Sequence, residues 1–180
     1  LFEELRGVAH GAEVDYDAIM TLTMAAPFES DEIPSCSVVA VMPERTADGR
    51  MIIGRNYDMF EDISKEAATR YLTYPEGGYF SAGNCDIWVG RWDGLNEAGL
   101  FTGFTSIFLP GPKSVLPGDI GWFTGRHILD HCATMEEAVK FIQDAPRSRS
   151  GGWLIADSSG KAVVVEASVK GIELRYPEDG

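Results

Sequence analysis

Cys36 opens a run of small and β-branched residues, and Arg55 and Asp58 stand together at the end of the next such run. A thiol can attack an amide carbonyl, but with a free pKa of about 8.5 only a few per cent of it is thiolate at neutral pH. A nearby arginine would lower the pKa of the thiol, because it favours the charged form. These residues therefore predict a nucleophilic site for covalent amide chemistry.

The peptide bond before Cys36 is a second feature of this site. Pro34 biases Ile33 toward extended geometry, so the chain that leads into Cys36 is expected to be non-helical. Cleavage between Ser35 and Cys36 would expose an α-amine with a pKa of about 8, which can act as general base for the thiol of the same residue. Nucleophile and base would then belong to one residue.

Simpler explanations exist for each residue taken alone. Cys36 could be a small buried side chain at the start of a strand. Arg55 and Asp58 could form a surface ion pair, worth about 0 to 1 kcal/mol. It is the combination of the three, rather than any single residue, that favours a catalytic site.

The composition limits the class of protein. With 180 residues, 44% of them hydrophobic, the chain is long enough for one domain with a buried core. The 28 acidic and 15 basic residues give a formal net charge of -13, which argues against nucleic acid and anionic membrane surfaces as partners. No apolar stretch approaches the roughly 20 residues that span a bilayer. Cys36, Cys85 and Cys132 are too irregularly spaced for a disulfide framework or a metal site, so we expect reduced thiols, a cytoplasmic protein and no cofactor.

Helices and strands follow one another in blocks along the chain. Helices are predicted at 1–10 and 15–24, the second capped by Asp15, and at 120–132 and 134–144. Thr134 and Glu137 form a capping-box pattern at the start of the last helix. Runs rich in β-branched and aromatic residues predict strands at 36–42, 50–56, 69–74, 86–92, 99–107, 152–157, 161–167 and 171–176. This order predicts an α+β protein with helices packed on mostly antiparallel sheets.

Further motifs extend the pattern around Cys36. The segments CSVVAV (36–41), GRNYD (54–58), DGLNEAGL (93–100) and LIADSSG (154–160) occur in this order. In this order and approximate spacing they resemble the linear-amide carbon-nitrogen hydrolases, a cysteine branch of the N-terminal-nucleophile (Ntn) hydrolases. That group includes choloylglycine hydrolases, penicillin V acylases and the acyl-coenzyme A:6-aminopenicillanate acyltransferase family, and the segment 1–35 is most similar to the helical leader of the acyltransferase branch.

The resemblance implies a fold, a reaction and a role for each matching residue. The implied fold is an αββα sandwich, with a leader over 1–35 and the N-terminal part of the Ntn-hydrolase domain over 36–180. Cys36 is the implied nucleophile, freed by autoproteolysis after Ser35, and it forms a thioester with the acyl group of a linear non-peptide amide. Arg55 is expected to contact the thiol, Asp58 to associate with the α-amine, and Asn96 to donate to the oxyanion. Asn96 could also be a turn residue, since Asp-Gly and Asn are common in turns.

The resemblance also implies that parts of the site lie elsewhere. A further oxyanion asparagine is expected beyond Gly180, and a second copy or a second chain is expected to complete the sheet. The small-molecule acyl amide is the expected partner of the site.

Two other functions remain open on the sequence alone. The chain could be a non-catalytic binding or assembly module that keeps the fold. It could also be a cysteine peptidase in which Cys36 pairs with His127 or His131, which lie four residues apart in a predicted helix, a spacing that also suits metal ligands. Large aromatic residues could line an acyl pocket, although core packing is the more common role of Trp88, Trp92, Trp122 and Trp153.

Overall fold

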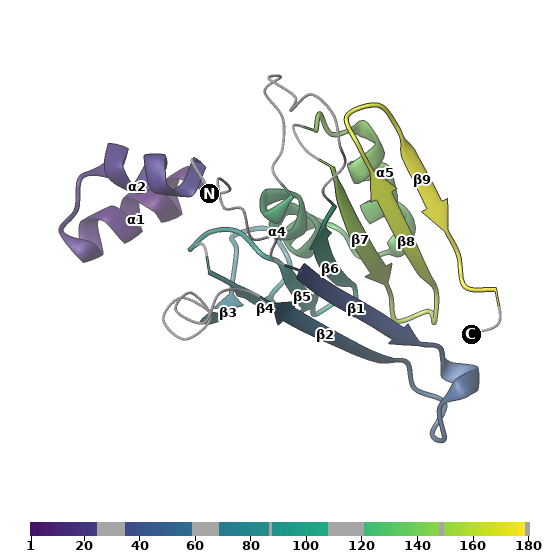
Figure 1. The fold of residues 1–180 in the computed structure, drawn as a ribbon. Helices are drawn as coiled ribbons and strands as arrows, with labels where there is room; N and C mark the ends of the chain where they lie inside the picture. The colour runs from purple at the N-terminus through teal and green to yellow at the C-terminus, as the bar shows by residue number, and fades with distance from the viewer. Residues whose placement is uncertain (25–34, 59–68, 87, 108–120, 148–149, 179–180) are drawn as a thin grey trace.

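The computed structural model describes residues 1–24, 35–58, 69–86, 88–107, 121–147 and 150–178. A large antiparallel sheet, in the spatial order β3-β4-β5-β6-β7-β8-β9, forms the centre of the molecule (Figure 1). Its strands are β3 (Thr69–Thr73), β4 (Ser81–Cys85), β5 (Asp93–Asn96), β6 (Phe101–Ser106), β7 (Gly151–Ala156), β8 (Ala162–Ala167) and β9 (Ile172–Arg175). A small antiparallel sheet contains β1 (Ser35–Val41) and β2 (Ile52–Asp58), and the 3-10 helix η1 (Pro43–Arg45) lies in the segment that joins them.

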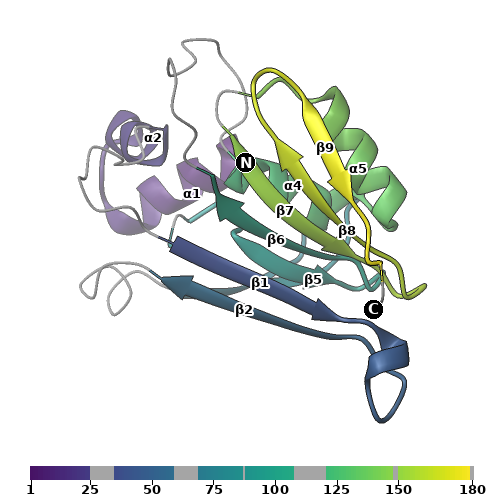
Figure 2. The ribbon, with the colours of Figure 1, turned by 45° about the vertical axis from the view of Figure 1, so that its right-hand side comes forward.

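Helices and the small sheet lie on opposite faces of the large sheet. Helices α4 (Trp122–His131) and α5 (Met135–Asp144) pack on one face, where a side chain at Gly94 would meet Leu129 of α4. Strand β1 packs on the other face, against β6 and β7, where a side chain at Gly103 would meet Val38 (Figure 2). The described residues thus form helix, sheet and sheet layers.

Each side of the large sheet has its own core. Toward the helices, aromatic rings pack closely: Trp92 and Trp122 meet edge to face with centroids 5.0 Å apart, and the tilted rings of Phe104 and Trp153 have the same separation. Toward the small sheet, Leu154 and Ala156 are buried with Met42. The contact between Trp92 and Trp122, the first residue of α4, thus joins this helix to the large sheet, as expected for tryptophans that face a core.

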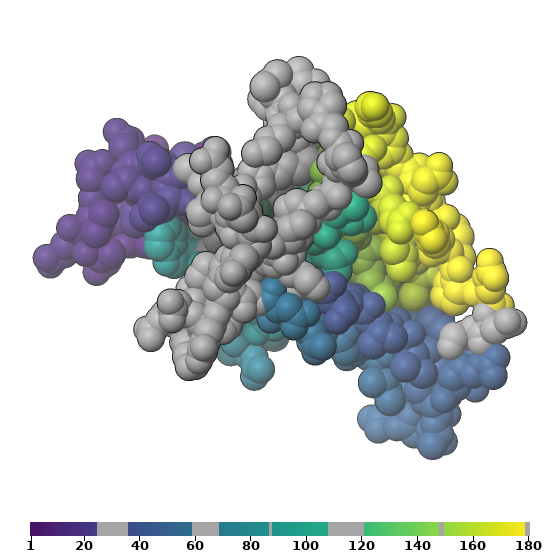
Figure 3. All heavy atoms as spheres, in the orientation of Figure 1, coloured from purple at the N-terminus to yellow at the C-terminus, as the bar shows by residue number. Residues whose placement is uncertain are grey.

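Helices α1 (Phe2–Ala12) and α2 (Tyr16–Met24) form a hairpin at the end of the molecule away from β8 and β9 (Figures 1 and 3). Asp15 caps α2 as predicted, since its Oδ1 accepts a hydrogen bond from the Asp17 amide at 2.9 Å. Leu5, Ala9 and Ile19 are buried against Val89, and Trp88 packs against the same cluster.

A buried arginine also joins the helical hairpin to the rest of the chain. Arg126 on α4, with a side chain 4% exposed, donates to both carboxylate oxygens of Glu4 on α1, at 2.7 and 3.0 Å. Its Nε donates to Asp130 one turn further along α4, at 2.7 Å. The contact between α1 and the body is therefore both apolar and ionic.

The α+β class and the antiparallel sheets are confirmed, and so is the capping box of α5, formed by Thr134 and Glu137. The predicted strand over 86–92 is wrong: the described residues of this range connect β4 to β5. Both of those strands were missed because SAGNC and DGLN contain few residues that favour strands. Gly83 pairs with Gly94. A Cβ added at Gly83 would lie 2.3 Å from the carbonyl oxygen of Asp93, and a Cβ added at Gly94 would lie 2.6 Å from Leu129. Close packing thus selects glycine in this part of the sheet.

Candidate active site

The register of the small sheet brings Cys36 and Arg55 together. Cys36 lies opposite Tyr57, and Val38 lies opposite Arg55, so Cys36 and Arg55 are diagonal neighbours on adjacent strands. Side chains alternate between the faces of a strand, and Cys36, Arg55 and Tyr57 all point to the partly buried face, toward the large sheet. The predicted contact between the arginine and the thiol is present: Arg55 Nη2 lies 3.6 Å from Cys36 Sγ.

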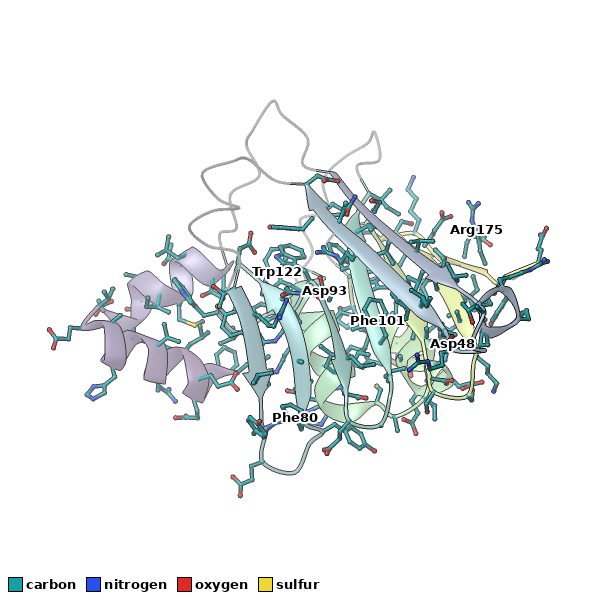
Figure 4. The ribbon with its side chains drawn as sticks, turned by 90° about the horizontal axis from the view of Figure 1, so that it is seen from below. Asp48, Phe80, Asp93, Phe101, Trp122 and Arg175 are labelled. Atoms are coloured by element: carbon teal, nitrogen blue, oxygen red, sulfur yellow. The ribbon has the colours of Figure 1, made fainter. Side chains whose placement is uncertain are left out.

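Two groups besides the thiol hold the Arg55 guanidinium in place. Its Nη2 also donates to the carbonyl oxygen of Phe104 on β6, at 3.2 Å. Its Nη1 forms an ion pair with Asp93 Oδ2 at 2.9 Å, and the two side chains are only 8% and 10% exposed. The other carboxylate oxygen of Asp93 accepts from Asn84 Nδ2 at 2.7 Å. Asp93, at the start of β5, lies on the large sheet beside the β1-β2 hairpin (Figure 4).

Opposing effects act on the thiol of Cys36. Burial raises the pKa of Cys36, and this effect exceeds the lowering by the positive charge of Arg55 and by a hydrogen bond from the Asp58 backbone. The carboxylates of Asp58 and Asp86 raise the pKa further. While Cys36 is joined to Ser35, its thiol is therefore mostly protonated at neutral pH and needs a base before it can attack.

Asp58 lies beside the bond that is predicted to be cleaved. It pairs with Ser35 across the small sheet, and β1 begins at Ser35, so the Ser35–Cys36 bond lies within the strand. Asp58 is exposed, whereas Arg55 and Tyr57 on the same strand are partly buried. Strand alternation thus places Asp58 on the outer face of the small sheet, close to the backbone of Cys36 rather than to its side chain.

Asn96 is the one predicted site residue that the structure does not bring to Cys36. Its Nδ2 donates to the carbonyl oxygens of Leu129 and Cys132, at 3.0 and 2.7 Å, and its Oδ1 accepts from the Leu100 amide at 3.0 Å. Both amide hydrogens are thus used at the end of α4, on the helix side of the large sheet. The geometry favours the structural explanation for Asn96 over a role in the oxyanion hole.

A cavity of about 180 Å³ adjoins the guanidinium of Arg55. Its lining residues are Arg55, Tyr57, Asn84, Cys85, Trp92 and Asp93. The Tyr57 hydroxyl and the Trp92 indole both donate to Asp86, which follows β4. Burial and the hydrogen bond to Asp86 raise the pKa of Tyr57 well above its ordinary value, so Tyr57 is a neutral hydrogen-bond donor at the wall of the site.

Asn84, Asp86 and Asp93 were missed as residues of the site by sequence reasoning. The one signal in the sequence is that Asp93 opens the DGLN motif, but Asn96 was the only residue of this motif that was predicted to belong to the site. Asn84 lies in a strand that the sequence did not predict, and Asp86 directly follows it, so their proximity to Arg55 followed only from the sheet order.

The pairing of Cys36 with a histidine finds no support in the geometry. His127 and His131 lie on α4, across the large sheet from β1, and the His127 ring stacks on Phe141 with centroids 3.8 Å apart. Cys85 and Cys132 are buried, and burial raises the pKa of Cys132 to about 11. Of the three cysteines, Cys36 is the partly exposed one, and Arg55 lies beside its thiol.

No cluster of metal-binding side chains occurs within the described part of the chain. In the same residues, no helix is long and apolar enough to cross a membrane.

Known structures of similar architecture define the class of the fold. A mutant conjugated bile acid hydrolase from Clostridium perfringens is 18% identical, with a TM-score of 0.59 over 80% of this chain and 51% of that chain. A Caenorhabditis elegans N-acylethanolamine-hydrolyzing acid amidase ortholog is 19% identical, with a TM-score of 0.58 over 78% of this chain and 63% of that chain. The fold is that of the Ntn hydrolases.

The sequence places the chain more closely within this class. It belongs to the acyl-coenzyme A:6-aminopenicillanic acid acyl-transferase family, whose sequence profile matches residues 45–178. An uncharacterized protein from Archaeoglobus fulgidus is 25% identical over 98% of this chain, and the match covers 34% of that protein. The chain thus spans about a third of this relative and about half of the bile acid hydrolase.

Proposed function

We propose that the complete protein is a cysteine amidohydrolase or acyltransferase that acts on a linear non-peptide amide, with Cys36 as its nucleophile. The observation that carries this proposal is the partly buried thiol 3.6 Å from Arg55 Nη2, in a chain of this family and fold. The arginine is itself fixed by Asp93 and Phe104, so the thiol has a preformed cationic neighbour.

Cleavage between Ser35 and Cys36 is the proposed activating step. Burial keeps the thiol protonated while the leader is attached, because Arg55 offsets only part of the effect of burial on the pKa. A freed α-amine, with a pKa of about 8, would accept the thiol proton without any further side chain. The resulting thiolate would be stabilised by Arg55 and the α-ammonium by the carboxylate of Asp58, which lies opposite Ser35 in the small sheet.

The proposed reaction then has two halves. The thiolate attacks the amide carbonyl carbon and forms a carbon-sulfur bond, and the negative charge passes to the carbonyl oxygen. The intermediate collapses as the α-ammonium protonates the nitrogen of the leaving amine, and the carbon-nitrogen bond breaks. Water or an acceptor amine then attacks the thioester, loses its proton to the α-amine and releases the Cys36 thiolate.

The mass of the purified full-length protein tests the first step. We expect wild type to lose the segment up to Ser35, whereas Cys36→Ala keeps the precursor mass, because it has no thiol to attack the preceding carbonyl. Cys132→Ala is the matched control, since Cys132 is buried across the large sheet, and it should be processed normally. Turnover of a panel of acyl amides should appear only in the processed proteins.

Other outcomes would favour other functions. Unchanged mass together with no turnover by wild type would contradict the enzyme and support a binding or assembly module. Activity that survives Cys36→Ala would also contradict the proposal. Loss of activity in His127→Ala or His131→Ala without loss of folding would support the peptidase instead.

A further inference from the structure

The ion pair between Asp93 and Arg55 is the most strongly buried contact of the site. The two side chains are 10% and 8% exposed, and Asp93 Oδ2 lies 2.9 Å from Arg55 Nη1. Asp93 is itself oriented by Asn84 Nδ2, which donates to its other oxygen at 2.7 Å. Through these contacts β4 and β5 of the large sheet fix a side chain of the small sheet.

We propose that Asp93 is a positioning residue that holds the Arg55 guanidinium against the Cys36 thiol and limits, by its charge, how strongly Arg55 favours the thiolate. The guanidinium is planar and rigid, so fixing Nη1 also fixes where Nη2 points. Nη2 is the atom that lies 3.6 Å from Cys36 Sγ and 3.2 Å from the Phe104 carbonyl oxygen. This inference deepens the proposed function and depends on it only for turnover.

The charges around the thiol give Asp93 its second effect. Arg55 and Tyr57 lie on the face of the small sheet that carries the Cys36 side chain, Asp58 ends β2 on the outer face, and Asp86 follows β4. Tyr57 stays neutral, so the positive charge of Arg55 is opposed by the carboxylates of Asp58 and Asp86 as well as by that of Asp93. Because Asp93 lies closest to the guanidinium, it neutralises much of the field that would otherwise act on the sulfur.

Two substitutions separate the positioning effect from the charge effect. Asp93→Asn keeps an oxygen for Arg55 Nη1 and removes the negative charge, and the exposed Asn84 amide can rotate to accept from the new amide group. The thiolate should then be favoured and the thiol pKa should fall. Asp93→Ala removes the anchor as well, so Arg55 can leave the sulfur and the thiol pKa should rise.

The rate of alkylation of Cys36 by iodoacetamide, followed by peptide mass spectrometry as a function of pH, measures this pKa. For Asp93→Asn we expect a fall of about half to one pH unit, which raises the alkylation rate at neutral pH about 2- to 4-fold, because a less basic thiolate is also less nucleophilic. For Asp93→Ala we expect slower alkylation. Asp48→Asn, in the exposed ion pair with Arg50, is the control and should match wild type.

Opposite shifts in the two Asp93 variants would support the proposal, and they would not depend on whether the protein turns over an amide. The proposal would be overturned if the thiol pKa is the same in Asp93→Asn, Asp93→Ala and Asp48→Asn, or if both Asp93 variants shift it in the same direction. If the Asp93 variants do not fold, Asn84→Ala decides, because it removes only the 2.7 Å hydrogen bond of an exposed side chain. Slower alkylation than in wild type would then support the proposal, and unchanged or faster alkylation would overturn it.

Discussion

Substitution of Asn96 by alanine separates a structural role from a catalytic one. The side chain is 4% exposed and makes three hydrogen bonds, to the carbonyl oxygens of Leu129 and Cys132 and from the Leu100 amide. Asn96→Ala leaves these backbone groups without that partner in a region closed to water. A buried group that loses its partner costs about 1 to 3 kcal/mol, and the carbonyl oxygens at the end of α4 keep a second lone pair for other donors.

We therefore expect Asn96→Ala to lower the free energy of unfolding by about 3 kcal/mol. Urea unfolding followed by tryptophan fluorescence measures this change, because Trp92, Trp122 and Trp153 are buried in the core between the large sheet and the helices. Asn56→Ala is the control, since Asn56 is exposed on β2, and it should change stability by no more than about 0.5 kcal/mol.

The opposite pattern would refute this reasoning. A donor to the oxyanion contributes to the rate and little to stability, and removal of one such donor typically costs about 100- to 1000-fold in turnover. If Asn96→Ala unfolds at the urea concentration of wild type and loses turnover by that factor, the catalytic role is correct. If the role is structural, Asn96→Ala lowers the free energy of unfolding, and the turnover that remains is in proportion to the fraction of protein that is folded.

The remaining predictions concern α1 and the centre of the large sheet. Burial raises the pKa of Glu4, but the hydrogen bond and charge of Arg126 outweigh it and hold the pKa below its usual value. The ion pair therefore stabilises the fold above about pH 4, and this contribution is lost as the pH falls through the lowered pKa. Because the Glu4 side chain is 42% exposed, water screens the pair, so Glu4→Gln should destabilise near neutral pH by only about 0.5 to 1 kcal/mol and flatten the acid loss in thermal melts. Gly94→Ala puts a Cβ 2.6 Å from Leu129, so it should cost about 1 to 3 kcal/mol in urea unfolding.

Matched variants serve as controls for both. Glu3→Gln, in the exposed pair with Arg6, should leave the melt unchanged, and an equal effect in Glu3→Gln and Glu4→Gln would contradict the role of Arg126. Gly54→Ala places its Cβ 3.6 Å from Val39, an ordinary contact, and equal stability of the two glycine variants would contradict the close packing at Gly94.

Local signals in the sequence were sufficient for the helices. Asp15 caps α2, and Thr134 with Glu137 caps α5, because a cap depends on residues within one turn of each other. The hairpin of β1 and β2 was predictable for a similar reason. Its runs are rich in β-branched residues, and their alternation puts Cys36 and Arg55 on one face.

Strands β4 and β5 were not predictable in this way. Their residues include Ser81, Gly83, Asn84, Asp93 and Gly94, which favour turns when judged alone. They form strands because both neighbours in the large sheet supply hydrogen bonds and because only glycine fits where the strands and α4 approach one another. Those neighbours are distant in sequence, so no local pattern records them.

The sequence by itself predicted the α+β class and the contact between Arg55 and the Cys36 thiol, since strand alternation and short motifs carry that information. The tertiary structure alone decided what each polar residue of the DGLN motif does. Asp93 and Asn96 are three residues apart on β5, so their side chains leave opposite faces of the large sheet. One face meets Arg55 and the other meets the end of α4, and this assignment follows from the layers packed on each side of the sheet.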